Sequence, residues 1–125
     1  MNNYEYSPIV DNFLEECHEI NQDNVPEVGS RSLEGLTNSI ENSDYNECVI
    51  FENKVVGFVV CFQDSEKTIS YMKAIEHKNF KEISKRVKNF LYFDRIAIDS
   101  KFRNNKLASG LYSNCLLYTS PSPRD

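Results

Sequence analysis

Residues 90–112 read FLYFDRIAIDSKFRNNKLASGLY and divide into an apolar run, a polar segment and a second apolar segment. The first part, residues 90–98, has the length and composition of a buried β-strand. The polar segment DSKFRNNK is rich in turn-forming and cationic residues. Leu107 and Leu111 then follow at helical spacing. These residues therefore predict a strand, a turn and a helix in succession.

The predicted turn has the properties of an anion site. A helix that begins directly after a turn presents unpaired backbone N–H groups and the positive end of its dipole, and this arrangement binds phosphate. Arg103 and Lys106 add positive charge at this point. An ordinary connection with solvated cations explains the same residues, so the pattern alone leaves both interpretations open.

The same residues resemble the signature of the GCN5-related N-acetyltransferase superfamily, in which the pattern Q/R-x-x-G-x-G/A opens a helix after the fourth strand. Arg103 stands at the first position of that pattern and Ala108 at the last. Lys106 stands where the pattern has its first glycine, which lets the backbone approach a pyrophosphate closely. A lysine ammonium also binds phosphate as a point charge and so offsets part of the loss.

Two further segments resemble one bacterial subgroup of acetyltransferases. They are NVPEVGS at residues 24–30 and NFKEISKRVKNFLYFDRIAID at residues 79–99. Together with VVGFVV at residues 55–60, the resemblance extends over most of residues 7–112 in the same order. It implies an α/β fold (α+β, with a mixed sheet) that corresponds to the N-terminal portion of the acyl-CoA N-acyltransferase fold.

The resemblance also implies an activity, the transfer of an acetyl or other acyl group from acyl-CoA to an amine of a small molecule or peptide. In this superfamily the pantetheine arm of CoA pairs with the fourth strand and the pyrophosphate lies on the turn that follows. The residues implied to bind acetyl-CoA are therefore Ile96, Ala97, Ile98, Arg103, Asn104, Asn105, Lys106, Leu107, Ala108 and Ser109.

Two ionisable residues of the strand are candidates for the catalytic base, Asp94 and Tyr92. Asp94 could equally be a structural partner of Arg95 or of a backbone N–H. Tyr112 comes too early to be the tyrosine that commonly protonates the leaving thiolate in the superfamily. Two alternatives remain open: a non-catalytic domain of this fold that binds CoA or a protein partner, and a small α/β interaction module without a ligand.

Composition narrows the function classes. The formal net charge of -5 argues against a general nucleic-acid binder, which normally carries a basic surface. We find no apolar run long enough to cross a membrane and no secretory signal. His18 and His77 lack metal-ligand spacing, so we expect no metal site. Three cysteines in predicted helices and strands, Cys17, Cys48 and Cys61, indicate buried free thiols and a cytoplasmic location.

The remaining elements follow from periodicity and capping residues. We expect a short strand at residues 3–6 and a helix that is capped by Ser7, begins at Pro8 and ends near Ile20. The inward face of that helix includes Val10. A second helix has Leu33, Leu36 and Ile40 facing inward. Strands at 47–51 and 55–62 are joined by a tight turn, Gly57 marks a bulge or a close approach, and a helix covers residues 79–88.

The C-terminal segment 115–125, CLLYTSPSPRD, differs from the rest of the sequence. It resembles a translation of the transposon-end adapter used in sequencing libraries, and a natural disordered tail is the alternative. We therefore expect a partial N-acetyltransferase domain at residues 1–114 and a non-native segment at 115–125 that neither continues the helix nor carries function. We also expect an unpaired outer edge on strand 90–98, which favours association.

Overall fold

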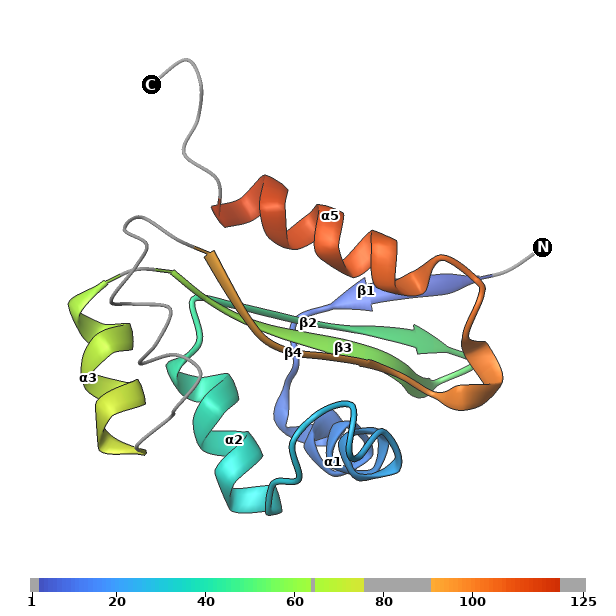
Figure 1. Cartoon of the computed structure of the whole chain (residues 1–125). Coiled ribbons are helices and arrows are strands. Elements are labelled where there is room, and N and C mark those ends of the chain that lie inside the picture. Colours follow the sequence, from blue (N-terminus) through green and yellow to red (C-terminus); the bar gives the residue numbers. More distant parts are fainter. Residues whose placement is uncertain (1–2, 64, 76–90, 120–125) are drawn as a thin grey trace.

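The structure, a computed structural model, describes residues 3–63, 65–75 and 91–119. A four-stranded antiparallel sheet of order β1-β2-β3-β4 forms its middle layer (Figure 1). The strands are β1 (Tyr4–Ser7), β2 (Tyr45–Phe51), β3 (Lys54–Gln63) and β4 (Leu91–Ile98). Among these residues the predicted α/β fold is confirmed.

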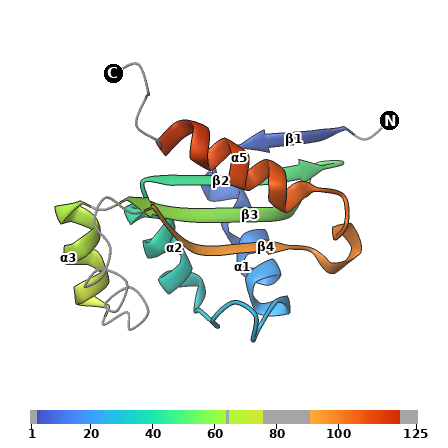
Figure 2. The same cartoon turned by 45° about the horizontal axis from the view of Figure 1, so that its top comes forward.

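Helices cover both faces of this sheet. Helices α1 (Leu14–Asp23) and α2 (Leu33–Asn42) lie on one face, and α5 (Leu107–Thr119) lies on the other (Figures 1 and 2). Helix α3 (Glu66–Ala74) follows β3 and contacts α2. Two short 3-10 helices, η1 (Asp11–Phe13) and η2 (Ser100–Phe102), precede α1 and follow β4.

Strand β3 has a core on each side. Phe58 and Phe62 pack with α1 and α2, whereas Val59 packs with Leu107 and Leu111 of α5. All five side chains are 3% exposed or less. Burial on both faces explains why this strand reads as a continuous apolar run without alternation.

The hairpin between β2 and β3 matches its prediction. Glu52 and Asn53 have φ angles of 51° and 67°, as a two-residue hairpin turn of type I′ requires. Gly57 also has both properties expected of it. The register shifts beside it, between Val49 and Ile50 of the partner strand. A Cβ at Gly57 would lie 2.6 Å from Cδ1 of Ile98 and 3.2 Å from the carbonyl oxygen of Ala97, so a larger residue would force at least the Ile98 side chain to move.

The first helix begins later than expected. Ser7 pairs with Cys48 as the last residue of β1, so it does not cap a helix, and its Oγ donates to the carbonyl of Pro8. The chain turns through η1 before α1 starts at Leu14, and α1 runs on to Asp23. Val10 lies in the extended segment before η1 and is 48% exposed, so its inward placement was also wrong.

The second helix follows its prediction more closely. Ser32 caps α2 by accepting a hydrogen bond from the N–H of Gly35. Leu36 and Ile40 are buried as expected. Leu33 is 38% exposed, because the first residue of the helix lies at the rim of the core.

The prediction that residues 115–125 do not continue the helix was wrong for 115–119, because α5 continues to Thr119. Cys115 follows Leu111 by one helical turn and is fully buried on the same face. The Tyr118 ring lies 4.9 Å from the Tyr45 ring. The foreign origin of residues 115–125 stays a prediction. The helix expected at 79–88 lies outside the described residues.

The cysteine prediction is confirmed for the thiols it covered. Cys17, Cys48 and Cys61 are fully buried and form no disulfide, and Cys115 is fully buried as well. Burial is the main cause that raises the pKa of Cys48 to about 12. A hydrogen bond with Cys115 and burial raise the pKa of Cys61 as well. These thiols are unreactive core residues rather than nucleophiles.

Candidate functional site

Strand β4 carries a bulge and an open edge. Arg95 pairs with Val60 and Phe93 pairs with Cys61, which leaves Asp94 as an extra residue on β4. Beyond the bulge, the N–H of Asp99 donates to the carbonyl of Val56 at 2.8 Å. Because antiparallel bonding alternates along the strand, the N–H and C=O groups of Ile96 and Ile98 point away from β3. Among the described strands β4 is the outermost on this side.

The turn after β4 takes two left-handed residues before α5 begins. Asn104 has a φ of 71° and Lys106 a φ of 62°. Lys106 therefore adopts the conformation that favours glycine, at the position where the acetyltransferase pattern has a glycine. Its carbonyl accepts from the N–H of Gly110 at 3.1 Å, which starts the helix. Asn105 closes the turn by donating to the carbonyl of Phe102.

A hollow of about 340 Å³ lies at this turn. It is lined by Ile98, Phe102, Arg103, Asn104, Lys106, Leu107, Ala108 and Ser109, and so it gathers seven of the ten residues implied to bind CoA. Of the other three, Asn105 lies in the turn and Ile96 lines a second hollow. Ala97 is buried in the core beneath α1, and its own backbone groups face β3.

The second hollow, of about 490 Å³, lies between β4 and the loop that joins α1 to α2. Both candidates for the base line it, together with Arg31 of that loop. Its full lining is Glu27, Val28, Gly29, Ser30, Arg31, Tyr92, Phe93, Asp94, Arg95, Ile96 and Tyr112. The Tyr112 ring packs edge-on against Phe93, with centroids 4.6 Å apart.

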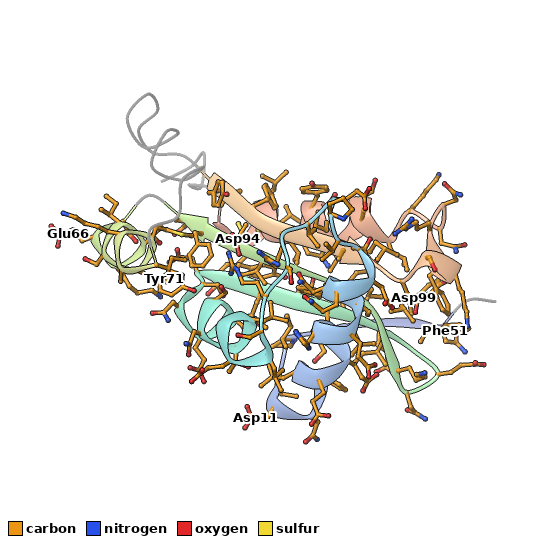
Figure 3. The ribbon with its side chains drawn as sticks, turned by 60° about the horizontal axis from the view of Figure 1, so that its bottom comes forward. Asp11, Phe51, Glu66, Tyr71, Asp94 and Asp99 are labelled. Atoms are coloured by element: carbon orange, nitrogen blue, oxygen red, sulfur yellow. The ribbon has the colours of Figure 1, made fainter. Side chains whose placement is uncertain are left out.

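Asp94, labelled in Figure 3, lies at the wall of this hollow and pairs with two arginines. Its Oδ2 lies 3.2 Å from Nε of Arg95 and 3.4 Å from Nη1 of Arg31. The side chains of Asp94 and Arg95 are 1% and 4% exposed. Asp94 is therefore an ion-pair partner of Arg95, as the structural interpretation expects, and its catalytic role stays a prediction. A base role would require this carboxylate to act from inside a buried ion pair.

Arg95 extends this polar cluster to α1. It donates to Oδ1 of Asn21 and to the carbonyl of Gly29 at 2.9 Å. Burial lowers the pKa of the Arg95 guanidinium, and the charge of Asp94 partly restores it. Arg31 also donates to Oγ of Ser39, which bonds the Tyr71 hydroxyl at 2.8 Å. The cluster thus ties the α1–α2 loop to the bulge in β4.

Tyr92 is a proton donor at neutral pH. Burial, and then the charge of Asp94, raise the pKa of its hydroxyl to about 12. The hydroxyl therefore stays protonated near pH 7 and is able to donate a hydrogen bond, whereas a base at this position would have to be deprotonated.

Sequence reasoning did not identify Asn24 or Arg31. Asn24 lies at the end of α1 and is 7% exposed. Its Nδ2 donates to the carbonyl of Ile98 at 3.2 Å, and its Oδ1 accepts from Nη2 of Arg103 at 2.7 Å. The segment NVPEVGS carried the resemblance, but no spacing in the sequence placed it beside β4. Only the fold brings these residues to the site.

The described ranges contain no cluster of three or more His, Cys, Asp or Glu side chains suited to a metal ion. They also contain no helix that is long and apolar enough to cross a membrane. His18 bonds the carbonyl of Arg31 through Nε2 at 2.7 Å, and His77 lies outside these ranges.

No family model and no curated protein matches this sequence. Solved structures do match. The loading GNATL domain of CurA from Lyngbya majuscula aligns with a TM-score of 0.70 at 14% identity, over 98% of this chain and 61% of that one. Ard1 from Thermoplasma volcanium aligns with a TM-score of 0.67 at 14% identity, over 93% and 63%.

A third similar structure contains ligands. It is the diaminobutyrate acetyltransferase EctA from Paenibacillus lautus in complex with L-2,4-diaminobutyric acid and coenzyme A, with a TM-score of 0.64 at 14% identity, over 93% and 58%. The chain thus spans about three-fifths of the length of these structures. Its fold is the N-terminal portion of the GCN5-related N-acetyltransferase fold.

Proposed function

We propose that this chain is part of a GCN5-related N-acyltransferase that transfers an acetyl or other acyl group from acyl-CoA to an amine. The observation that carries the proposal is the coincidence of three features at one end of β4. A turn with two exposed cations opens α5, Lys106 adopts a glycine-like φ of 62°, and the backbone groups of Ile98 face outward beside the turn. The sequence pattern of the superfamily falls on the same residues.

The proposed cofactor pose follows from this arrangement. The pyrophosphate of CoA would lie in the hollow at the turn, where the first N–H groups of α5 and the charge of Arg103 favour an anion. The pantetheine arm would extend along β4 and bond the outward groups of Ile98 and Ile96, as an added strand does. This direction leads the thioester toward the bulge at Asp94 and the second hollow.

The second hollow would then receive the amine. Transfer requires the amine to attack the thioester carbonyl, lose a proton and release the CoA thiolate. Tyr92 would orient a reactant by donating a hydrogen bond. Asp94 and Tyr92 stay the proposed catalytic residues, with any base action of Asp94 relayed through water. The acceptor would be a small-molecule or peptide amine, and EctA, which has a similar fold, is seen with a diamine acid and coenzyme A.

One observation favours a second candidate, a non-catalytic module of the same fold that binds CoA or a protein partner. The carboxylate nearest the proposed reaction centre is 1% exposed and holds two guanidinium groups. Such a carboxylate is a weak base, because protonation would leave buried cations uncompensated.

Calorimetric titration of the full chain with CoA tests the anion site. We expect Arg103→Glu to weaken binding by tenfold or more, because it reverses a charge at the turn. Lys101→Glu is the matched control, since it makes the same charge change two residues away and outside the hollow. Equal affinities of the two variants would contradict the site. Acetyl transfer to a panel of amines, measured by thiol release, then distinguishes the catalyst from the non-catalytic module.

A further inference from the structure

Asn24 joins three elements at the proposed CoA site through its side chain. Its Nδ2 donates to the carbonyl of Ile20 in α1 at 2.8 Å and to the carbonyl of Ile98 at the end of β4 at 3.2 Å. Its Oδ1 accepts from Nη2 of Arg103 at 2.7 Å. The two longer-range bonds span 74 and 79 positions of the chain. One 7% exposed amide therefore fixes the strand end and the turn relative to each other.

The chemistry of this contact matters because Asn24 is neutral. A carboxylate at this position would fix the Arg103 guanidinium but compensate its charge. An amide oxygen fixes the guanidinium and leaves its charge available, and the remaining N–H groups of the arginine stay free to bind an anion. Among the described residues no carboxylate lies within ion-pair distance of Arg103.

We propose that Asn24 is a positioning residue for acyl-CoA: it orients Arg103 toward the pyrophosphate without neutralising it, and it sets the Ile98 carbonyl at the edge where the pantetheine arm pairs. This inference rests on the proposed function. It assigns to the end of α1, an element outside the turn and the strand, a part in binding both halves of the cofactor.

The test compares two substitutions of Asn24 with a control. Asn24→Ala removes all three contacts. Asn24→Asp keeps an acceptor for Arg103 but loses the donors and adds a negative charge. Asn114→Ala is the control, because Asn114 also makes a long-range bond, from Nδ2 to Oε1 of Glu47 at 2.9 Å, and lies about two turns along α5, outside the lining of both hollows. Circular dichroism establishes that each full-length variant is folded.

The ligands are CoA, titrated at low and high salt, and pantetheine, which lacks phosphate, titrated by NMR. We expect Asn24→Ala to weaken CoA binding about five- to tenfold, on the scale of one typical hydrogen bond lost. Asn24→Asp should weaken it further at low salt, and the added loss should shrink at high salt because screening weakens the opposing charge. Pantetheine should not distinguish the Ala variant from the Asp variant.

The outcomes test two claims separately: that Asn24 positions Arg103, and that its neutrality matters for CoA binding. Asn24→Ala binding CoA as tightly as Asn114→Ala would overturn the positioning role. Asp and Ala variants with equal CoA affinity at both salt concentrations would overturn the argument from neutrality. If Asn24→Ala does not fold, Asn24→Asp carries the test by its salt dependence. If the unmodified chain binds no CoA, the proposed function fails and the positioning role fails with it.

Discussion

The arginines near β4 are held in two opposite ways. Arg95 and Arg31 share one buried carboxylate, Asp94, whose single negative charge offsets part of theirs inside the protein. Arg103 is exposed and bonds a neutral amide, that of Asn24. The first arrangement supports the architecture of the bulge. The second fixes a cation that has no carboxylate partner among the described residues, which is what an anion site requires.

A single loop takes part in both arrangements. Asn24 stands at its beginning and Arg31 near its end, and the carbonyl of Gly29 between them accepts from Arg95. The loop between α1 and α2 therefore lies along β4 from the turn to the bulge. A change at Asn24 is expected to act on the turn that would bind the cofactor. A change at Arg31 is expected to act on the hollow beside Tyr92.

Removal of the Asp94 charge should have the largest effect. In Asp94→Asn the guanidinium of Arg95, 4% exposed, loses its counterion. We expect the free energy of unfolding to fall by about 3–5 kcal/mol, the range for one partner removed from a buried pair. Denaturation in urea measures it. Asp11→Asn, on exposed η1, is the control and should change stability by less than about 0.5 kcal/mol. A loss below about 1 kcal/mol in Asp94→Asn would show that the pair is not structural.

The turn could be predicted from sequence and the cluster could not, for a physical reason. The turn, capping and helix signals in residues 99–111 are local. The turn and the start of the helix could therefore be predicted from neighbouring residues. The contacts of Asp94 with Arg31 and of Asn24 with Arg103 span 63 and 79 positions and exist only once β4 lies beside α1. The prediction that Ser7 caps a helix was wrong because its pairing with Cys48 in the sheet outweighed its local preference for a helix cap.

Tyr92 should give the next largest effect, and only in alkali. Its folded pKa of about 12 lies above the unfolded value near 10, so its contribution to stability is complete below about pH 10 and is lost as pH rises through 12. Between about pH 8 and pH 11 the unmodified chain should lose about 1.4 kcal/mol more than Tyr92→Phe. Urea denaturation at both pH values measures it, with Tyr112→Phe as the control from the same hollow. Identical alkaline losses in all three proteins would disprove the shift.

Substitution of Lys106 tests whether its backbone conformation or its charge matters more at the turn after β4. Lys106 has a φ of 62°, which glycine adopts without a steric cost. The substitution Lys106→Gly should therefore raise the free energy of unfolding by about 1 kcal/mol. Asn104→Gly, at a φ of 71°, is the control and should gain less, because asparagine tolerates the left-handed region. If the lysine charge aids CoA, Lys106→Gly should also weaken CoA binding and flatten its salt dependence. If the backbone matters more, CoA affinity should hold or rise.

The smallest change in stability should come from substitution of Arg103. Comparing it with Arg31 tests directly whether an arginine bonded to an amide differs from one paired with a carboxylate. Arg103→Gln removes an exposed side chain that bonds the neutral amide of Asn24, so we expect a loss below about 1 kcal/mol in the free energy of unfolding. Arg31→Gln, which removes a partner of buried Asp94, should cost more. Calorimetry with CoA should give the opposite order, because Arg103 has no carboxylate partner among the described residues whereas Arg31 pairs with Asp94. If one arginine variant had the larger effect on both the free energy of unfolding and the CoA affinity, the type of partner, carboxylate or amide, would not determine whether an arginine stabilises the fold or binds the cofactor.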